Sequence, residues 1–389
     1  MTPDRRTVAL GLGALAAAGC TEQLDDKVDG IVRPRENPSA PPPMTSSRPV
    51  TDAASLREFL DVQVAATRVP ALAAAIVSPS GVAFMAASGL QVVGRPEPVE
   101  ADDPWHIGSD TKAMTAALYA RLVDQGKAKW GAALAELFPD LGEQMNPGWA
   151  AVRIEALLSH TAGLKDVGAT WVVARRLDRS SPVEQRTSTV RDTLSNPPQA
   201  PVGQYAYSNL GYILAGAAIE RITGKPWEVS IRDHVFEPLG MNGAGFGPPQ
   251  GDAPMGHVRN LFGRLQAVNI DNPPALGPAG TVHLPLADWA KFVRVFIDPD
   301  QRFLSSSSLE HLTKPVVPEY ALGWAIMDVS DAGRVLTHDG SNTAWLAEVV
   351  AVPERRIALL VVTNCAGAPA VQAITAVREA VRPLLVKGV

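Results

Sequence analysis

Cysteine is almost absent from this chain of 389 residues, which contains only Cys20 and Cys365. Two cysteines cannot build a disulfide framework, and no C-x-x-C pair is present for metal binding or redox chemistry. Positive charge is not concentrated either, since 35 lysines and arginines face 40 aspartates and glutamates, giving a net charge of -5. Without a dense basic run to follow a phosphate backbone, we expect no nucleic-acid partner.

The signature motifs of several enzyme classes are missing as well. There is no G-x-S-x-G nucleophile elbow, no H-E-x-x-H metal helix and no G-x-x-x-x-G-K-[ST] phosphate loop. The seven histidines are scattered, and His160 is expected to have a structural, hydrogen-bonded role. Hydrophobic residues make up 46% of the chain and charged residues 19%, which predicts an ordinary globular protein with a large core.

The first twenty residues have the pattern of an export signal. Arg5 and Arg6 form a charged head, residues 8–18 are apolar but too short to span a membrane as a final anchor, and Ala-Ala-Gly-Cys20 follows. We predict a signal peptide over residues 1–19, with twin-arginine export, and lipidation of Cys20, because small residues precede it as in a bacterial lipobox. Plain export stays open, since Ala17 stands where a lipobox more often has leucine.

Residues 20–50 are predicted to form a proline-rich tether. They are charged and then rich in proline, with almost no apolar periodicity. Such a tether suits a domain held off a membrane surface. We therefore expect an exported, periplasmic lipoprotein that is anchored to the membrane through Cys20 and folds over residues 51–389.

Helical and strand-like patterns follow one another in the folded part. Thr51-Asp52 can cap a helix that ends near Pro70, and two apolar runs around the turn at residues 78–81 predict a hairpin over residues 71–87. Further helices are predicted over residues 110–125, 154–158, 210–223 and 285–296, strands over 320–327, 334–338, 344–352 and 357–363, and a closing helix over 369–385.

This order of elements predicts an α/β (α+β) fold. An early hairpin and late strands indicate that both ends of the chain build one antiparallel sheet flanked by helices. We assign the sheet part to residues 51–107 and 277–389, and an inserted, mostly helical part to residues 108–276. A functional site is expected in the crevice between the two parts.

The chain contains a single S-x-x-K motif, formed by Ser109 and Lys112 at the start of a predicted helix. Residues three apart lie on one helix face, so the lysine can reach the serine hydroxyl. Burial near the positive helix end favours a neutral lysine, which can accept the serine proton and create a nucleophile. The motif alone also fits an N-cap serine followed by a solvated lysine.

Two later segments carry groups that suit this chemistry. Tyr207-Ser208-Asn209 lies in a loop before a predicted helix, where the phenol could act as a base beside Lys112 and Asn209 could bind Lys112 or the substrate. A partly buried tyrosine with a capping asparagine is the alternative. His338-Asp339-Gly340 ends a predicted strand, which places its backbone on the opposite wall of the crevice. A simple turn is the alternative for this segment.

These segments resemble the serine β-lactamase and penicillin-binding-protein superfamily, in particular the group of class C β-lactamases, D-alanyl-D-alanine carboxypeptidases and related esterases. The resemblance extends from about Thr51 to the C-terminus and does not depend on the short motifs alone. Its segments, in chain order, are residues 107–112, 157–164, 207–212, 238–241, 277–280 and 338–342.

The resemblance implies a mechanism through an acyl-enzyme. Ser109 would attack a carbonyl, Lys112 and Tyr207 would manage its proton, and the backbone N–H groups of Ser109 and Ser341 would hold the oxyanion. Neither a metal nor an organic cofactor enters this scheme. The residues assigned to substrate binding are Asn209, His338, Gly340 and Ser341.

The chain departs from β-lactamases of this group, which usually have Lys-Thr-Gly where this chain has residues 338–340. Histidine is only partly charged near neutral pH, and Asp339 would repel a substrate carboxylate if it faced the crevice. We therefore rank esterase-like hydrolysis of small esters or amides first, D-alanyl-D-alanine carboxypeptidase or D-aminopeptidase activity on peptidoglycan-type peptides second, and weak class C-type β-lactamase activity third. An inactive domain that binds peptidoglycan or a partner is the alternative of another class.

Overall fold

The computed structural model describes residues 48–388. The predicted signal peptide, Cys20 and most of the predicted tether lie outside the described residues and stay predictions. Within residues 48–388, no helix is both long enough and apolar enough to cross a membrane.

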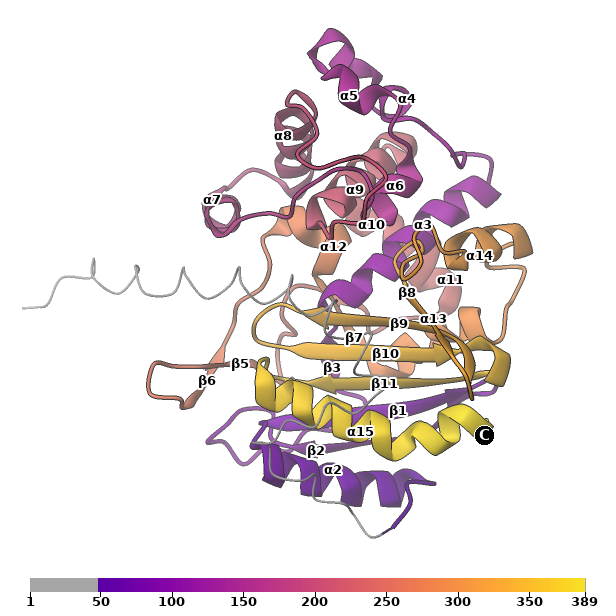
Figure 1. The fold of residues 1–389 in the computed structure, drawn as a ribbon. Helices are drawn as coiled ribbons and strands as arrows, with labels where there is room; N and C mark the ends of the chain where they lie inside the picture. The colour runs from indigo at the N-terminus through magenta and orange to yellow at the C-terminus, as the bar shows by residue number, and fades with distance from the viewer. Residues whose placement is uncertain (1–47, 389) are drawn as a thin grey trace, which may run out of the picture.

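A six-stranded antiparallel sheet combines strands from the early and the late part of the described chain (Figure 1). Its strand order is β2-β1-β11-β10-β9-β8, so the early hairpin joins the edge of a late meander, which confirms the predicted fold class. The strands are β1 (Ala71–Ser78), β2 (Gly81–Gly89), β8 (Ala325–Val329), β9 (Gly333–Ser341), β10 (Leu346–Val352) and β11 (Ile357–Thr363).

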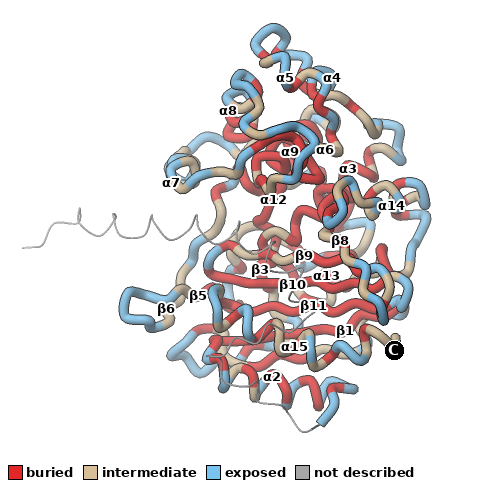
Figure 2. Tube along the Cα trace, in the orientation of Figure 1, coloured by how far each residue is buried: buried red, intermediate tan, exposed pale blue. Residues whose placement is uncertain are grey.

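The central strands are buried on both faces (Figure 2). Side chains alternate along a strand, so Ala73 and Ala75 of β1 enter one hydrophobic core while Leu72 and Ile76 enter another. Helix α13 (Leu286–Ile297) packs on the first face, and α2 (Ala53–Thr67) and α15 (Ala368–Lys387) pack together on the second. The predicted cap of α2 is confirmed, because the Asp52 side chain accepts the Ser55 N–H.

Most remaining helices stack beyond β9, on the side away from α2 (Figure 1). Helix α9 is central to this group and is buried over most of its length. The helices are α3 (Thr111–Asp124), α4 (Leu134–Leu137), α5 (Pro147–Ala150), α6 (Ile154–Leu158), α7 (Ala169–Leu177), α8 (Pro182–Leu194), α9 (Asn209–Thr223), α10 (Trp227–Ile231), α11 (Glu237–Leu239), α12 (Gly277–Gly280) and α14 (Ser306–Thr313).

Five short strands were not predicted from the sequence, and three of them, at residues 245–246, 256–259 and 265–268, lie in the part that was predicted to be mostly helical. A three-stranded sheet and a separate hairpin were missed, because strands of so few residues carry too little alternation to be recognised. They are β3 (Pro104–His106), β4 (Gly245–Phe246) and β7 (Val282–Pro285) in the small sheet, and β5 (Gly256–Arg259) and β6 (Leu265–Val268) in the hairpin.

The strand predicted over residues 320–327 was wrong in its first half. Strand β8 begins only at Ala325, because Gly323 has a φ of +82°, which a regular strand cannot contain. A β-carbon on Gly323 would lie 2.9 Å from the backbone of both Lys112 and Ala113. Residues 320–324 therefore form a buried segment that packs on the first turn of α3.

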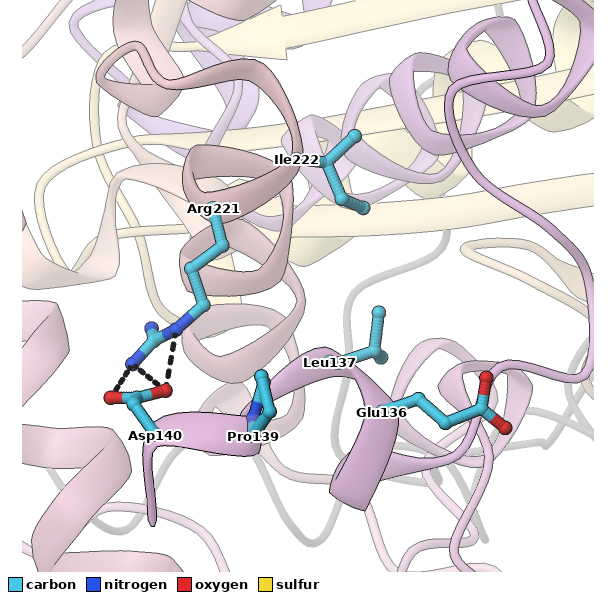
Figure 3. Close-up of a pocket in the computed structure, with 6 residues that line it drawn as sticks. All are labelled: Glu136, Leu137, Pro139, Asp140, Arg221 and Ile222. Atoms are coloured by element: carbon cyan, nitrogen blue, oxygen red, sulfur yellow. Dashed lines mark hydrogen bonds and ion pairs between the residues drawn. The ribbon is translucent and has the colours of Figure 1, made fainter. Parts of the chain in front are cut away.

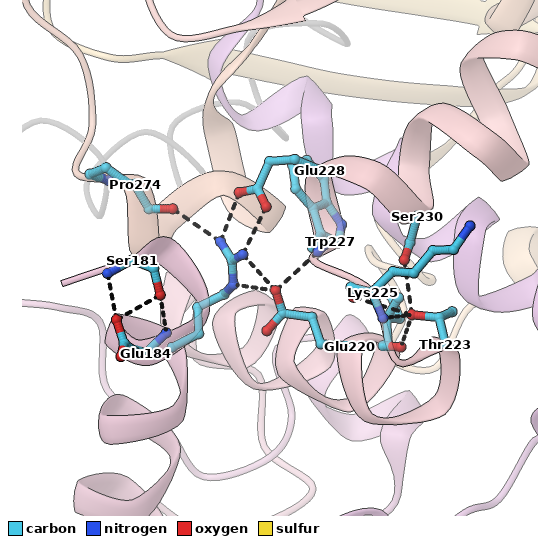
Figure 4. A network of polar contacts seen from close by, with 11 residues as sticks. Ser181, Glu184, Glu220, Thr223, Lys225, Trp227, Glu228, Ser230 and Pro274 are labelled. Carbon is cyan, nitrogen blue, oxygen red and sulfur yellow. Dashed lines mark hydrogen bonds and ion pairs between the residues drawn. The ribbon is translucent and has the colours of Figure 1, made fainter.

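A buried ion network ties α8, α9 and α10 together (Figure 4). Arg186 is fully buried, and its five N–H donors reach Glu220, Glu228 and the Pro274 carbonyl at distances of 2.6–3.1 Å. Burial opposes the charge, but the carboxylates of Glu228 and Glu220 outweigh it and raise the pKa of Arg186. Because every donor has an acceptor, the charge is tolerated inside the protein.

We expect Arg186→Met to lower the free energy of unfolding by about 3 kcal/mol, because it leaves two carboxylates uncompensated in the interior. The matched control is Arg302→Gln, which removes an ion pair with Asp300 at a side chain that is 91% exposed. That substitution should change the free energy of unfolding by less than about 0.5 kcal/mol. Urea unfolding measures both values, and equal effects would contradict the structural role assigned to Arg186.

Candidate active site

Ser109 lies in a one-turn helix, η1 (Gly108–Asp110), which joins β3 to α3. Gly108 has a φ of +50°, and its N–H donates to His106 Nδ1 at 3.1 Å. A β-carbon on Gly108 would lie 2.4 Å from the backbone nitrogen of Ser341, so only glycine fits this turn. Ser109 itself is half-buried, which leaves its hydroxyl accessible in a tightly fixed turn.

Strand β9 contacts the backbone of this turn directly. A β-carbon on Gly340 would lie 1.8 Å from the Ile107 carbonyl oxygen and 2.7 Å from Asp110 Oδ2. The two segments that were predicted to supply the oxyanion-binding N–H groups, at Ser109 and Ser341, are therefore neighbours in space. The absence of a side chain at residue 340 is what permits this approach.

Lys112 is fully buried in the first turn of α3. Its Nζ lies 2.9 Å from Ser109 Oγ, 2.8 Å from Asn209 Oδ1 and 2.9 Å from the Ala279 carbonyl oxygen. The last two oxygens can only accept, so they bind the two hydrogens that a neutral amine retains. The lone pair of that amine would then point at Ser109 Oγ. The site thus orients Lys112 for proton transfer with the serine.

Asn209 is oriented by a residue that the sequence did not single out. The Asp166 carboxylate accepts the Asn209 backbone N–H at 2.8 Å and its side-chain Nδ2 at 3.1 Å. With Nδ2 bound to a carboxylate, the amide oxygen must face Lys112. Asp166 therefore fixes both the start of α9 and the acceptor for the lysine.

Tyr207 reaches the same serine from the loop before α9. Its hydroxyl lies 2.9 Å from Ser109 Oγ, and the Lys112 Nζ lies 4.9 Å from the centre of the Tyr207 ring. Ser109 Oγ therefore contacts both candidate proton acceptors. The structure brings together Ser109, Lys112, Tyr207 and Asn209, as the sequence predicted, although their catalytic roles stay predictions.

His338 and Asp339 point to opposite faces of the sheet. Gly340 faces the turn at Ser109, and so does His338, because residues two apart in a strand share a face. Asp339 lies on the other face, opposite Glu348, whose carboxylate is 2.5 Å from Arg378 of α15. The carboxylate of Asp339 therefore does not line the wall that faces Ser109, and the repulsion considered from the sequence does not arise there.

Asp271 connects two segments that flank the site, and the sequence analysis did not identify it. Its Oδ1 lies 2.9 Å from His106 Nε2 and accepts the Asn342 side-chain N–H at 2.9 Å. His106 in turn holds the Gly108 N–H, so Asp271 links the turn before Ser109 with the turn after Ser341. Asp271 lies in a loop with no sequence motif, so no local signal could have identified it.

A separate hollow lies at the far end of α9 (Figure 3). Arg221, which pairs with Asp140 at its rim, is twelve residues from Asn209, or about 18 Å along the helix. The residues that line it are Glu136, Leu137, Pro139, Asp140, Arg221 and Ile222. This set contains no nucleophile, so the hollow is not part of the site. Among the described residues, no three His, Cys, Asp or Glu side chains are grouped to hold a metal ion.

Comparison with known proteins agrees with this geometry. The β-lactamase family model matches residues 56–382, which is most of the chain. The chain belongs to the β-lactamase family. It is 27% identical over 304 residues to penicillin-binding protein 4 of Amycolatopsis lactamdurans, covering 72% of this chain and 76% of that protein. It is 31% identical over 210 residues to the esterase EstB of Burkholderia gladioli, covering 50% of this chain and 53% of that protein.

Solved structures show the same β-lactamase-family fold. The octameric penicillin-binding protein homologue from Pyrococcus abyssi matches with a TM-score of 0.73 and 24% identity, over 86% of this chain and 78% of that one. The D-amino acid amidase from Ochrobactrum anthropi SV3 matches with a TM-score of 0.69 and 23% identity, over 84% and 97%. The serine hydrolase character predicted from the sequence is supported by esterases, penicillin-binding proteins and amidases among these relatives.

We expect Gly340→Ala to slow modification of Ser109 by a fluorophosphonate at least about 100-fold, because the new methyl group would displace the turn that carries the serine. The control is Gly168→Ala, since a β-carbon there meets nothing closer than 4.0 Å. The labelling rate, followed by intact mass, should be near that of the wild type in the control. Normal labelling of Gly340→Ala would show that the close approach of β9 is not required.

Proposed function

We propose that this protein hydrolyses small neutral esters or amides through an acyl-enzyme on Ser109. The observation that carries this proposal is the pair of 2.9 Å contacts that Ser109 Oγ makes with Lys112 Nζ and the Tyr207 hydroxyl. A serine hydroxyl becomes a nucleophile only when a positioned base takes its proton, and both candidate bases lie within reach.

The proposed reaction has two halves. Ser109 Oγ bonds to the substrate carbonyl carbon as its proton passes to Lys112 or Tyr207, and the backbone N–H groups of Ser109 and Ser341 stabilise the oxyanion. The intermediate then collapses, and the leaving alcohol or amine takes that proton as its bond to the carbonyl carbon breaks. In the second half, water attacks the carbonyl carbon of the acyl-enzyme and gives a proton to the same base. The bond between that carbon and Ser109 Oγ then breaks, and Oγ takes the proton from the base as the acid leaves.

The preference for neutral substrates rests on the wall formed by β9. His338 stands where related β-lactamases usually have a lysine that binds a carboxylate, and Asp339 lies on the other face of the strand. The identity with EstB supports ester hydrolysis. Peptidoglycan-type peptides are the second candidate substrate. They are supported by the similarity to penicillin-binding protein 4 and to the carboxypeptidase/endopeptidase AmpH of Escherichia coli, which is 24% identical over 281 residues.

The nucleophile is tested by exposure to a fluorophosphonate and intact-mass analysis. We expect one adduct per chain in the wild type and in the control Ser307→Ala, which removes an exposed serine, and no adduct in Ser109→Ala. A turnover panel of a p-nitrophenyl ester, a chromogenic cephalosporin and a peptide ending in D-Ala-D-Ala then tests the substrate class. Cephalosporin turnover faster than ester turnover would overturn the ranking, and no acylation or turnover at all would favour an inactive binding domain.

We also propose that the protein is exported and anchored to the membrane by a lipid on Cys20, as the leader and the proline-rich tether suggest. Metabolic labelling with a fatty acid should mark the wild type and leave Cys20→Ala unlabelled. The second cysteine, Cys365, is buried and serves as the internal control through Cys365→Ala, which should stay labelled. An unlabelled wild type would leave plain periplasmic export.

A further inference from the structure

Tyr320 lies between two histidines that come from opposite walls of the site. Its hydroxyl is 3.2 Å from Nε2 of His160, in the loop after α6, and 3.0 Å from Nε2 of His338, in β9. All three side chains are buried. The hydroxyl therefore connects the helical wall with the sheet wall.

The hydrogen-bond partners fix the proton of His160. The Ser208 N–H donates to His160 Nδ1 at 3.1 Å, so this nitrogen carries no proton. The proton of the neutral ring is therefore on Nε2, which donates to the Tyr320 hydroxyl. Burial, the largest cause, lowers the pKa of His160 well below 6.5, so the ring is neutral at physiological pH.

The partners of His338 fix the opposite tautomer. Its Nδ1 is 2.8 Å from the Asp339 carbonyl oxygen, which can only accept, so Nδ1 carries a proton. In the neutral ring, Nε2 then accepts the Tyr320 hydroxyl proton. Burial raises the pKa of Tyr320 well above 10, so this hydroxyl keeps its proton to donate. Both nitrogens of His338 are thus occupied within the protein.

His160 also holds Tyr207 from both sides. Its carbonyl oxygen accepts the Ala206 N–H at 2.8 Å, and its ring accepts the Ser208 N–H, so the two neighbours of Tyr207 are bound to one residue. The rings of His160 and Tyr207 lie 4.3 Å apart with an angle of 34° between their planes. The position of the Tyr207 hydroxyl therefore depends on where the His160 ring is held.

We propose that Tyr320 is a positioning residue that joins His160 and His338 into one directed hydrogen-bond chain, which holds Tyr207 against Ser109 and withholds His338 from the substrate carboxylate. The inference rests on the proposed function at Ser109, and it changes the role of His338 from substrate binding to support. With both ring nitrogens of His338 bound within the protein, the site then selects substrates whose acyl group is neutral near the β9 side.

Acid should break this chain. Protonated His160 would direct an Nδ1 hydrogen at the Ser208 N–H, and this repulsion would separate the His160 ring from the segment that carries Tyr207. The groups that face the two rings are Lys112 of α3, Tyr212 of α9, and Tyr205 and Tyr207 of the loop before it, together with Tyr320. Ester turnover should therefore fall on the acid side as the Tyr207 loop is released.

Tyr320→Phe removes only the hydroxyl, so Nε2 of His338 loses its hydrogen bond to Tyr320. We expect kcat for a neutral p-nitrophenyl ester to fall roughly 10- to 100-fold with little change in KM, because Tyr207 is misplaced. The ratio of kcat/KM for an ester bearing an acyl carboxylate, p-nitrophenyl hydrogen succinate, to that for p-nitrophenyl butyrate should rise about tenfold, since Nε2 of His338 loses the Tyr320 hydroxyl as a partner and can bind the anion. A role in folding alone would not move this ratio.

Tyr119→Phe is the matched control. Tyr119 is equally buried, and its hydroxyl donates to the Lys129 carbonyl oxygen at 2.9 Å rather than to a histidine. This variant should keep the wild-type ratio for the two esters. Equal ratios in Tyr320→Phe, Tyr119→Phe and the wild type would overturn the chain, whereas failure of the wild type to form a Ser109 adduct would overturn the proposed function instead.

The tautomers test the chain without a variant of Tyr320. In the full chain labelled with ¹⁵N-histidine, at pH 7, NMR should show a neutral His160 protonated on Nε2 and a neutral His338 protonated on Nδ1. His160→Gln and His338→Gln assign the two sets of signals. A charged His338, or a neutral His338 protonated on Nε2, would overturn the proposal even if Tyr320→Phe does not fold.

Discussion

The site depends on a lysine amine that is buried and fully engaged. Lys112 Nζ lies within hydrogen-bond distance of three oxygens, and two of these, Asn209 Oδ1 and the Ala279 carbonyl oxygen, cannot donate. Burying a polar amine without hydrogen-bond partners would be costly. The partners present here also fix the position of the nitrogen. The remaining hydrogen-bonding direction of Nζ points at Ser109 Oγ. The geometry at this nitrogen therefore determines whether the serine hydroxyl can be activated.

The rest of the fold supplies these partners from distant parts of the sequence. Asn209 comes from the first turn of α9, the carbonyl of Ala279 from α12, and the serine from the turn after β3. The sheet presses against that turn at Gly340, where no side chain could be accommodated. The Arg186 network ties α9, the helix that begins at Asn209, to α8 and α10.

The sequence predicted which candidate residues lie together at the site, because their types and order are unusual together. Ser109 and Lys112 share a helical turn, and the loop at Tyr207 precedes an apolar helix that is easily recognised. A hydrogen-bonded role was expected for His160, but its partner Tyr320 was not predictable. The contact between His106 and Asp271 was not predictable either, because both pairs are about 160 positions apart with no local pattern. Tyr320 was also assigned to a strand, since a buried irregular segment and a buried strand have the same apolar composition.

The most direct test of the account is pre-steady-state hydrolysis of a p-nitrophenyl ester. The wild type should release one equivalent of p-nitrophenolate per chain in a fast burst, with the acyl mass found on the peptide that contains Ser109. Lys112→Met, which keeps a long buried side chain but no amine, should show no burst. A burst of unchanged rate and size in Lys112→Met would contradict the claim that the lysine amine activates Ser109.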